Sequence, residues 1–473
     1  MLFRFLFSAL LVQAFSVALP GQHDYQPGTY TKAIPPELLR AHEARMDREL
    51  LPYRREKVER NYREAAYAER LERLQLQFEA GIFLEASPLQ DYVQQVFDRI
   101  VAANTINCTY PLRIQIESSG TVNALNYGNG IISIHLGLLQ RLEREDQLAF
   151  VLAHELAHAH LDHFEAALAL RLREHTDQTL QQQIKAIRRQ TYNRYAQATA
   201  LSRQFHYEYR ASRREYELAA DALGVTYLTQ AGYDAAAAAE VLAILDGADQ
   251  PIDSSRLDLT AIFHHAEFPF KARWLYSDDV ELMAADYQQE REFDRDSMRT
   301  HPDIPLRLNT LGASPTGRAP DTVFQLGVQR TAALELVYAL YHHGQYAQSL
   351  YRALLLLRHY PDSGYLHGMV GLNLGGIHLL RTERRYVDQV PLASMASTPN
   401  FQQLLRMLEN LRLQELAQLT HYYLLPKEAR FASDETFLLA LIEATYLTAD
   451  EMRRTVYEQR YNELYPNGRL FTR

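Results

Sequence analysis

The stretch Val151-Leu152-Ala153-His154-Glu155-Leu156-Ala157-His158-Ala159-His160-Leu161-Asp162-His163 decides how the rest of the chain is interpreted. It is rich in Ala and Leu and contains neither Gly nor Pro, so it predicts a buried helix. At about 100° per residue, His154 and His158 lie one turn apart on one face, close enough for two imidazoles to hold one metal ion. Glu155 lies beside that face, where it can take a proton from a water on the metal.

These residues form the pattern H-E-x-x-H, which is typical of the metal-binding helix of zinc metallopeptidases. The alternative is a core helix with histidines satisfied by other contacts, because the chain contains 18 His in 473 residues. His160 and His163 follow on the same predicted helix, but rotations of about 240° and 180° from His154 exclude them as ligands. We expect them on the second face or at the end of the helix.

A second helical segment carries the carboxylates that such a site needs. Glu217-Leu218-Ala219-Ala220-Asp221 begins 59 residues beyond His158, in an Ala-rich setting that ends near Gly224. A catalytic zinc ion takes three protein ligands and leaves a fourth position to water, and two His with one Glu are a standard set. Glu217 is therefore the candidate third ligand. Asp221, one turn on, can accept the outer N–H of a ligating imidazole. The alternative, a solvated Glu/Asp pair, is disfavoured by the upstream motif.

Together these segments resemble peptidase family forty-eight, the zinc metallopeptidases that include the CaaX prenyl endopeptidases and the HtpX-like heat-shock proteases. The resemblance covers about Leu89–Leu311 and is carried by Val122–Asn126, Gly130–Leu139, Leu148–Glu155 and Ser212–Gly224. The chain is similar to the soluble, periplasmic BepA-type branch, in which a tetratricopeptide domain follows the protease. The resemblance implies a metalloendopeptidase with one Zn²⁺ per chain.

Two further roles come from the resemblance alone. Thr300-His301-Pro302, followed by Arg307-Leu308, resembles the element that ends the protease domain. His301 is thus a candidate oxyanion stabiliser, or a fourth ligand that keeps the enzyme latent, with a helix-capping turn as the alternative. Gly130–His135 is assigned as the edge strand that binds the substrate backbone, against the alternative of an ordinary buried hairpin. His135 itself is expected to be structural.

The hydrophobic pattern predicts an α+β fold that is mainly α. Residues 37–80 predict one or two long helices broken near Pro52, and residues 88–102 predict an amphipathic helix. Alternation predicts strands at Leu112–Ile116, Val122–Asn126 and Ile131–His135, which together form a small antiparallel sheet before the metal helix. This zincin-type domain is followed by an α-helical repeat domain. There Leu336, Gly344, Tyr346 and Pro361 fit one 34-residue tetratricopeptide repeat.

The expected domain order begins with a signal peptide over residues 1–18, with Arg4 before an apolar run and Ser16-Val17-Ala18 for cleavage. A retained N-terminal anchor is the alternative. Residues 19–85 form a leader and helical scaffold, 86–312 the peptidase domain, 313–320 a linker and 321–473 the tetratricopeptide-like domain. A solvated helical excursion is expected over 164–211. The mature chain is expected to be periplasmic, soluble or peripheral to a membrane, and without a transmembrane span.

Composition excludes several other classes of protein. The net charge of −9 leaves no basic surplus for nucleic acid. The single cysteine, Cys108, excludes an internal disulfide framework and a cysteine-ligated zinc site.

Two functions remain. The first is a zinc endopeptidase that hydrolyses misfolded or unassembled cell-envelope proteins, with Glu155 as general base. The second is an envelope chaperone or assembly scaffold with a latent metal site, whose C-terminal helices bind assembly proteins.

Overall fold

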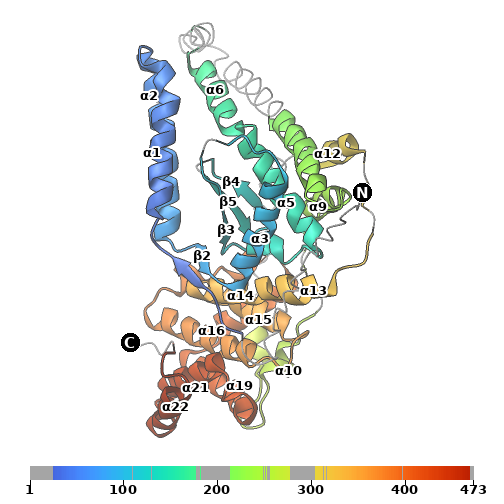
Figure 1. Cartoon of the computed structure of the whole chain (residues 1–473). Helices are drawn as coiled ribbons and strands as arrows, with labels where there is room; N and C mark the ends of the chain where they lie inside the picture. The colour runs from blue at the N-terminus through green and yellow to red at the C-terminus, as the bar shows by residue number, and fades with distance from the viewer. Residues whose placement is uncertain are drawn as a thin grey trace, which may run out of the picture.

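A five-stranded sheet forms the centre of the region that precedes residue 312 (Figure 1). The computed structural model describes residues 25–468 apart from 109, 129, 177–181, 183–212, 249, 251, 253–255, 277–303, 313, 316 and 397. The strands, in the order β1-β2-β3-β5-β4, are β1 Thr29–Thr31, β2 Phe83–Ala86, β3 Arg113–Glu117, β5 Ile131–His135 and β4 Ala124–Asn126. Each pair is antiparallel except β3–β5, which is parallel. The α+β, mainly α class is confirmed.

The sheet is mixed, not antiparallel as predicted, because the hairpin formed by β4 and β5 docks through its second strand. The chain turns from β4 into β5 through Gly128 and Gly130, which have φ of 70° and 96°. β5 then pairs with β3 on one side and with β4 on the other. The prediction that Gly130–His135 is an edge strand is therefore wrong, because the edge strands of the sheet are β4 and β1.

Two helices cover one face of this sheet. Ile114, Ile116, Ile132 and Ile134 alternate onto that face and share a buried core with α3 (Pro88–Ala103) and α5 (Glu145–His160). α3 agrees with the predicted helix. Ser87 caps it by accepting a hydrogen bond from the Gln90 N–H at 3.0 Å, and Pro88 occupies its first turn.

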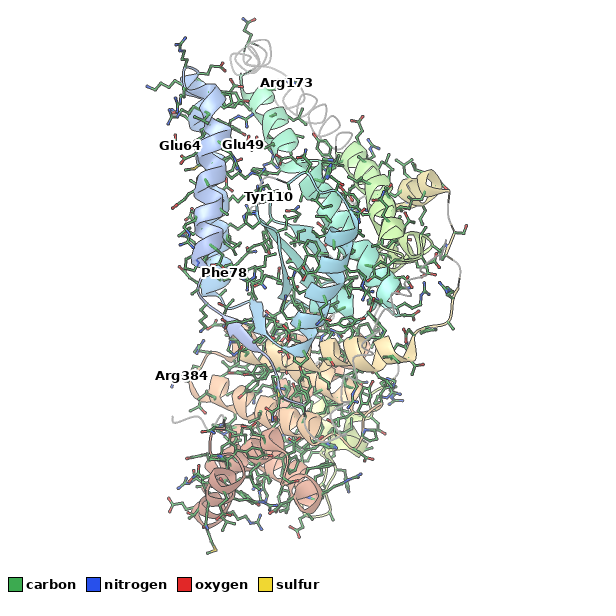
Figure 2. The ribbon with its side chains drawn as sticks, viewed as in Figure 1. Glu49, Glu64, Phe78, Tyr110, Arg173 and Arg384 are labelled. Carbon is green, nitrogen blue, oxygen red and sulfur yellow. The ribbon has the colours of Figure 1, made fainter. Side chains whose placement is uncertain are left out.

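The N-terminal helices stand beside the sheet as a long column (Figure 1). α1 (Pro36–Leu50) ends in the short 3₁₀ turn Leu51–Tyr53, which contains Pro52, and α2 (Lys57–Glu79) follows. The predicted break near Pro52 is confirmed. Phe78, at the lower end of α2 (Figure 2), packs against Phe83 with ring centroids 4.7 Å apart. Strand β1 lies within the predicted leader, where the sequence indicated no strand.

The helices around the metal motif are α5, α6 (His163–Thr176), a helical segment over 213–230, α9 (Ala237–Asp246) and α12 (Ile304–Leu311). The short helix α4 (Leu136–Leu139) precedes them. The predicted helix over 151–163 is too long, because α5 ends at His160 and Asp162 takes a left-handed φ of 49°. Of the predicted helical excursion over 164–211, only α6 and residue 182 fall within the described residues.

The C-terminal part is helical and lies below the sheet in Figure 1. α14 (Arg330–His342) and α15 (Tyr346–Leu356) are followed by α16 (Gly364–Thr382). The tetratricopeptide repeat stays a prediction. The remaining elements are α13 (Thr322–Phe324), the π-helical Gln325–Gln329, α17 (Tyr386–Gln389), the 3₁₀ turn Ala393–Met395, α18 (Pro399–Asn410), α19 (Leu413–Leu424), the 3₁₀ turn Leu425–Lys427, α20 (Glu428–Phe431), α21 (Glu435–Thr448) and α22 (Glu451–Leu464).

The two regions interleave along the chain. α10 (Leu259–Phe263) and the 3₁₀ turn Ala272–Leu275 precede α12 in sequence, yet their buried side chains belong to the core of the C-terminal helices. Trp274 is fully buried there, and its indole N–H donates to Glu415 at 3.4 Å. Residues within the predicted range 86–312 therefore contribute to both cores.

No helix in the part of the chain that the structure describes has the length and apolar composition to cross a membrane.

Candidate metal centre

The structure brings the two histidines of α5 and the glutamate of the segment 213–230 to one point. His154 Nε2 and His158 Nε2 lie 3.1 Å apart, and Glu217 oxygens lie 3.5 Å from the first and 3.6 Å from the second. Within the described residues, these three side chains form the group whose ligand atoms all lie within 4.8 Å of one another. His154 and Glu217 are buried, and the side chain of His158 is 15% exposed.

These separations fit a zinc ion. Ligands about 2.0–2.1 Å from a tetrahedral zinc lie roughly 3.3 Å from one another, and the observed separations bracket that value. The set of two imidazoles and one carboxylate leaves a fourth position for water or substrate. The residues of this chain can therefore hold the metal.

Close packing of two helices puts Glu217 within reach of α5. A Cβ atom on Gly224 would come 3.2 Å from His154 Cα and 3.3 Å from His154 N, so a larger side chain would push the segment 213–230 away. Ala220, one turn before Gly224, is fully buried in the same core. The small side chains of this segment thus allow its backbone to pack closely against the backbone of α5.

Asp221 and Arg307 lie directly behind the ligands. Asp221 Oδ1 is 3.0 Å from His154 Nδ1, the ring nitrogen that faces away from Glu217. Arg307, from α12, donates two hydrogen bonds of 2.7 Å to the Asp221 carboxylate, and its Nη1 lies 3.0 Å from Glu217 Oε2. Asp221 and Arg307 are 1% and 2% exposed. The position of Asp221 agrees with the prediction, whereas no role was predicted for Arg307, although the R-L element of the family resemblance contains it.

The electrostatics of this group favour its charged forms. Burial raises the pKa of Asp221, but hydrogen bonds from Arg307 and His154 outweigh burial and hold that pKa below its usual range. Burial likewise lowers the pKa of His154, but hydrogen bonds to Asp221 and Glu217 prevail and raise it to about 9. The site thus attracts positive charge, which a divalent metal ion supplies.

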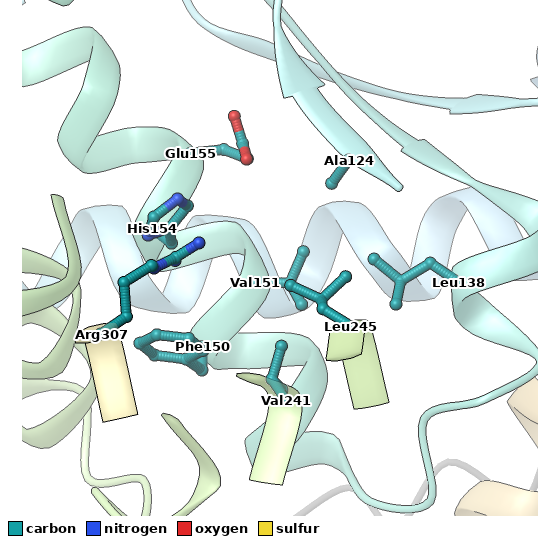
Figure 3. A pocket seen from close by; sticks show the side chains of 9 residues that line it. All are labelled: Ala124, Leu138, Phe150, Val151, His154, Glu155, Val241, Leu245 and Arg307. Atoms are coloured by element: carbon teal, nitrogen blue, oxygen red, sulfur yellow. The ribbon is translucent and has the colours of Figure 1, made fainter. Parts of the chain in front are cut away.

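Glu155 lines a small apolar pocket next to His154. Figure 3 shows His154, Glu155 and Arg307 on one side and aliphatic side chains on the other. The pocket, with its open mouth included, encloses about 280 Å³. Its lining comes from β4, α4, α5, α9 and α12 and consists of Ala124, Leu138, Phe150, Val151, His154, Glu155, Val241, Leu245 and Arg307.

The edge strand β4 runs beside this pocket. Ala124 is one of the pocket residues, and the Asn126 side chain donates to the Glu155 carbonyl oxygen at 3.3 Å. The sheet edge next to the candidate metal centre is therefore β4, whereas the predicted substrate strand, Gly130–His135, contains the internal strand β5.

The other histidines of the motif region have different surroundings. His160 Nδ1 accepts from the Tyr227 hydroxyl at 2.6 Å and lies outside the metal cluster, as expected. His163 lies at the start of α6, and its Nδ1 is 2.8 Å from His158 Nδ1. Burial lowers the pKa of His163 to about 4. The contact of His163 with His158 was not predicted, because one continuous helix through residue 163 would put the two rings on different faces.

His135 and His301 are the two other histidines to which the sequence analysis assigned a role. His135 is buried on the opposite face of the sheet, where its Nε2 lies 3.3 Å from Glu117, in keeping with the structural role expected for it. His301 lies outside the described residues.

The comparison with known families agrees with this geometry. Residues 87–314 match the model of Peptidase family M48, whose members are typically zinc-dependent. No curated protein matches the chain. The chain therefore carries a Peptidase family M48 domain over residues 87–314, and this domain indicates a metallopeptidase.

Proposed function

We propose that this metallopeptidase is a zinc endopeptidase with His154, His158 and Glu217 as ligands and Glu155 as general base. The observation that carries the proposal is the convergence of three ligand atoms from α5 and the segment 213–230 at tetrahedral separations. A bound zinc ion would polarise the scissile carbonyl and lower the pKa of a water toward about 7.

The residues of the chain supply the rest of the chemistry. Glu155 follows His154 directly and lines the same pocket, so its carboxylate is placed to take a proton from the attacking water and pass it to the leaving amine. Asp221 accepts the outer N–H of His154 and fixes the orientation of that ring. Arg307 holds Asp221 in place through two hydrogen bonds. His301 keeps its proposed role as oxyanion stabiliser or latch.

The substrate would bind in extended form along β4. An edge strand offers backbone groups to which a peptide can add as a further strand, and β4 is the edge nearest Glu155. The neighbouring pocket has a mostly apolar lining, which suits an apolar side chain of the substrate.

The wider biological setting is also proposed. The signal-like residues 1–18 support export to the periplasm, although they lie outside the described residues. The consecutive helices α14, α15 and α16, with Gly344 in a left-handed turn between the first two, support a tetratricopeptide-like domain of the BepA type. We propose misfolded or unassembled cell-envelope proteins as the substrates, with the C-terminal helices as the surface for assembly partners.

The test compares wild type with Glu155→Gln, measuring bound zinc and the cleavage of casein or an unfolded protein. We expect one zinc per chain in both, and cleavage about 10²–10⁴-fold slower in the variant, because only the proton acceptor is lost. Glu79→Gln makes the same change at an exposed position at the end of α2 and should cleave like wild type. Unchanged cleavage by Glu155→Gln would refute the proposed mechanism.

A further inference from the structure

The turn after α5 returns the chain to the metal centre. α5 ends at His160, and Asp162, with a φ of 49°, redirects the backbone so that α6 begins at His163. The His163 ring meets the His158 ring edge to face, with centroids 4.8 Å apart and planes at 76°. Their Nδ1 atoms lie 2.8 Å apart. A residue five positions beyond the second histidine thus contacts the back of that candidate ligand.

The position of the proton on His158 decides which of the two rings donates the hydrogen bond. His158 Nε2 faces His154 and Glu217, so it is the nitrogen available to a metal. A neutral imidazole carries one proton, and a metal on Nε2 leaves that proton on Nδ1. His158 Nδ1–H then donates to His163 Nδ1.

We propose that His163 is a positioning residue, which fixes the tautomer and ring orientation of His158 from behind. The usual acceptors in this position are a carboxylate, a backbone carbonyl or water, and Asp221 plays that part for His154. This inference rests on the proposed zinc site.

His163 is itself held from two sides. Its ring stacks on Tyr216 of the segment 213–230, with centroids 4.6 Å apart and planes at 24°. The preceding residue, Asp162, pairs with Arg45 of α1 at 2.7 Å, and the Arg45 guanidinium is almost fully buried.

Arg45 also anchors the hairpin that leads into β5. Its second nitrogen donates to the Gly128 carbonyl at 2.7 Å, and its guanidinium lies 4.2 Å from the centroid of Tyr110. Figure 2 shows Tyr110 between the N-terminal helices and the rest of the domain. The N-terminal helices therefore help to set the turn that presents His163.

The test is the zinc affinity of two His163 variants, measured by competition with a chromogenic chelator. His163→Phe keeps an aromatic ring against Tyr216 but removes the acceptor. His163→Asn offers an oxygen near the position of Nδ1. We expect His163→Phe to bind zinc about 10–100-fold more weakly than wild type, and His163→Asn to recover most of that loss. Thermal unfolding of the metal-free variants checks that both fold.

The neighbouring His160 supplies a matched control, since its Nδ1 is engaged by Tyr227 and not by a candidate ligand. His160→Phe should keep wild-type zinc affinity. Wild-type affinity in His163→Phe, or equal losses in His163→Phe and His163→Asn, would overturn the proposal. If wild type itself bound no zinc, the proposed function would fail. If wild type bound zinc and cleaved protein while His163→Phe matched it, only the role of His163 would fail.

Discussion

The core around the metal centre and the core of the C-terminal helices differ in the polar groups that they bury. Around the metal centre, Glu155, Glu217, Asp221 and Arg307 are all 5% exposed or less. In the C-terminal helices, the neutral Ser349, Asn373 and Thr420 have no exposure at all, and the acidic Glu335 and Asp434, 1% and 5% exposed, accept hydrogen bonds from neutral donors.

The difference shows what each core is built to do. Buried charges are costly unless they are paired, so a group of four within one domain indicates a site where charge is needed. Neutral hydroxyls and amides can be satisfied locally, as when Ser349 donates to the Val337 carbonyl at 2.7 Å and accepts from Asn373 at 2.8 Å. Substitutions should therefore destabilise the core around the metal centre by leaving a charge unpaired. In the core of the C-terminal helices, they should destabilise the protein by leaving a cavity.

Replacing Arg307, the buried arginine behind the metal ligands, should give the largest effect. Arg307→Met keeps much of the side-chain volume but removes the buried guanidinium that pairs with both Asp221 and Glu217. We expect urea unfolding of the metal-free protein to show a loss of about 3–5 kcal/mol. Arg318→Met, which breaks the exposed pair with Asp234, should cost less than about 1 kcal/mol. Similar losses in the two variants would show that burial of charge does not distinguish this site.

A cavity in the C-terminal core should be nearly as destabilising but without consequence for the metal. Leu438, on α21, is fully buried, so Leu438→Ala should lower the free energy of unfolding by about 2–5 kcal/mol. Zinc affinity of the folded protein, measured by chelator competition, should stay at the wild-type value. A zinc affinity that fell together with stability would break the distinction between the two cores.

Neutralising Asp221, which lies behind His154, should have a smaller effect than these two losses of stability, and it should act on zinc affinity. Asp221→Asn retains an acceptor for His154 Nδ1–H but removes the charge that pairs with Arg307. We expect zinc binding to weaken about 10-fold, or about 1.4 kcal/mol. Asp234→Asn, at a partly exposed carboxylate, is the control and should leave the affinity unchanged. A tighter site in Asp221→Asn would contradict the orienting role.

The C-terminal core should also show a pH dependence. His367 Nδ1 lies 2.8 Å from the Tyr423 hydroxyl and Nε2 lies 3.0 Å from the Pro361 carbonyl, an arrangement that suits a neutral ring. Burial lowers the pKa of His367 from 6.5 to about 4. The neutral ring therefore contributes stability that is complete above about pH 6.5 and is lost as pH falls toward 4.

Thermal unfolding of the metal-free protein between pH 7.5 and 4 tests this pH dependence. His367→Gln cannot titrate, so its melting temperature should fall less than that of wild type across this interval. Parallel curves for the two proteins would mean that His367 does not titrate with the lowered pKa.

Much of the candidate site could be predicted from local sequence. His154 and His158 share a face because of the helical period, and Glu217 and Asp221 share one for the same reason. Strand β5 coincides with the predicted Ile131–His135, and the helices on both sides of Pro52 were also expected. Each of these features depends on contacts within one turn or one strand, which the sequence specifies directly.

The tertiary structure alone decided how these segments meet. Arg307 reaches Asp221 across 86 residues, β5 lies inside the sheet because a hairpin docked through its second strand, and Trp274 joins a core formed mostly by residues after 330. His163 faces His158 because Asp162 takes a left-handed conformation. No glycine at this position indicates such a turn in the sequence. Local sequence sets periods and turns, whereas these pairings come from burying apolar surface and compensating charge over the whole chain, which no short segment encodes.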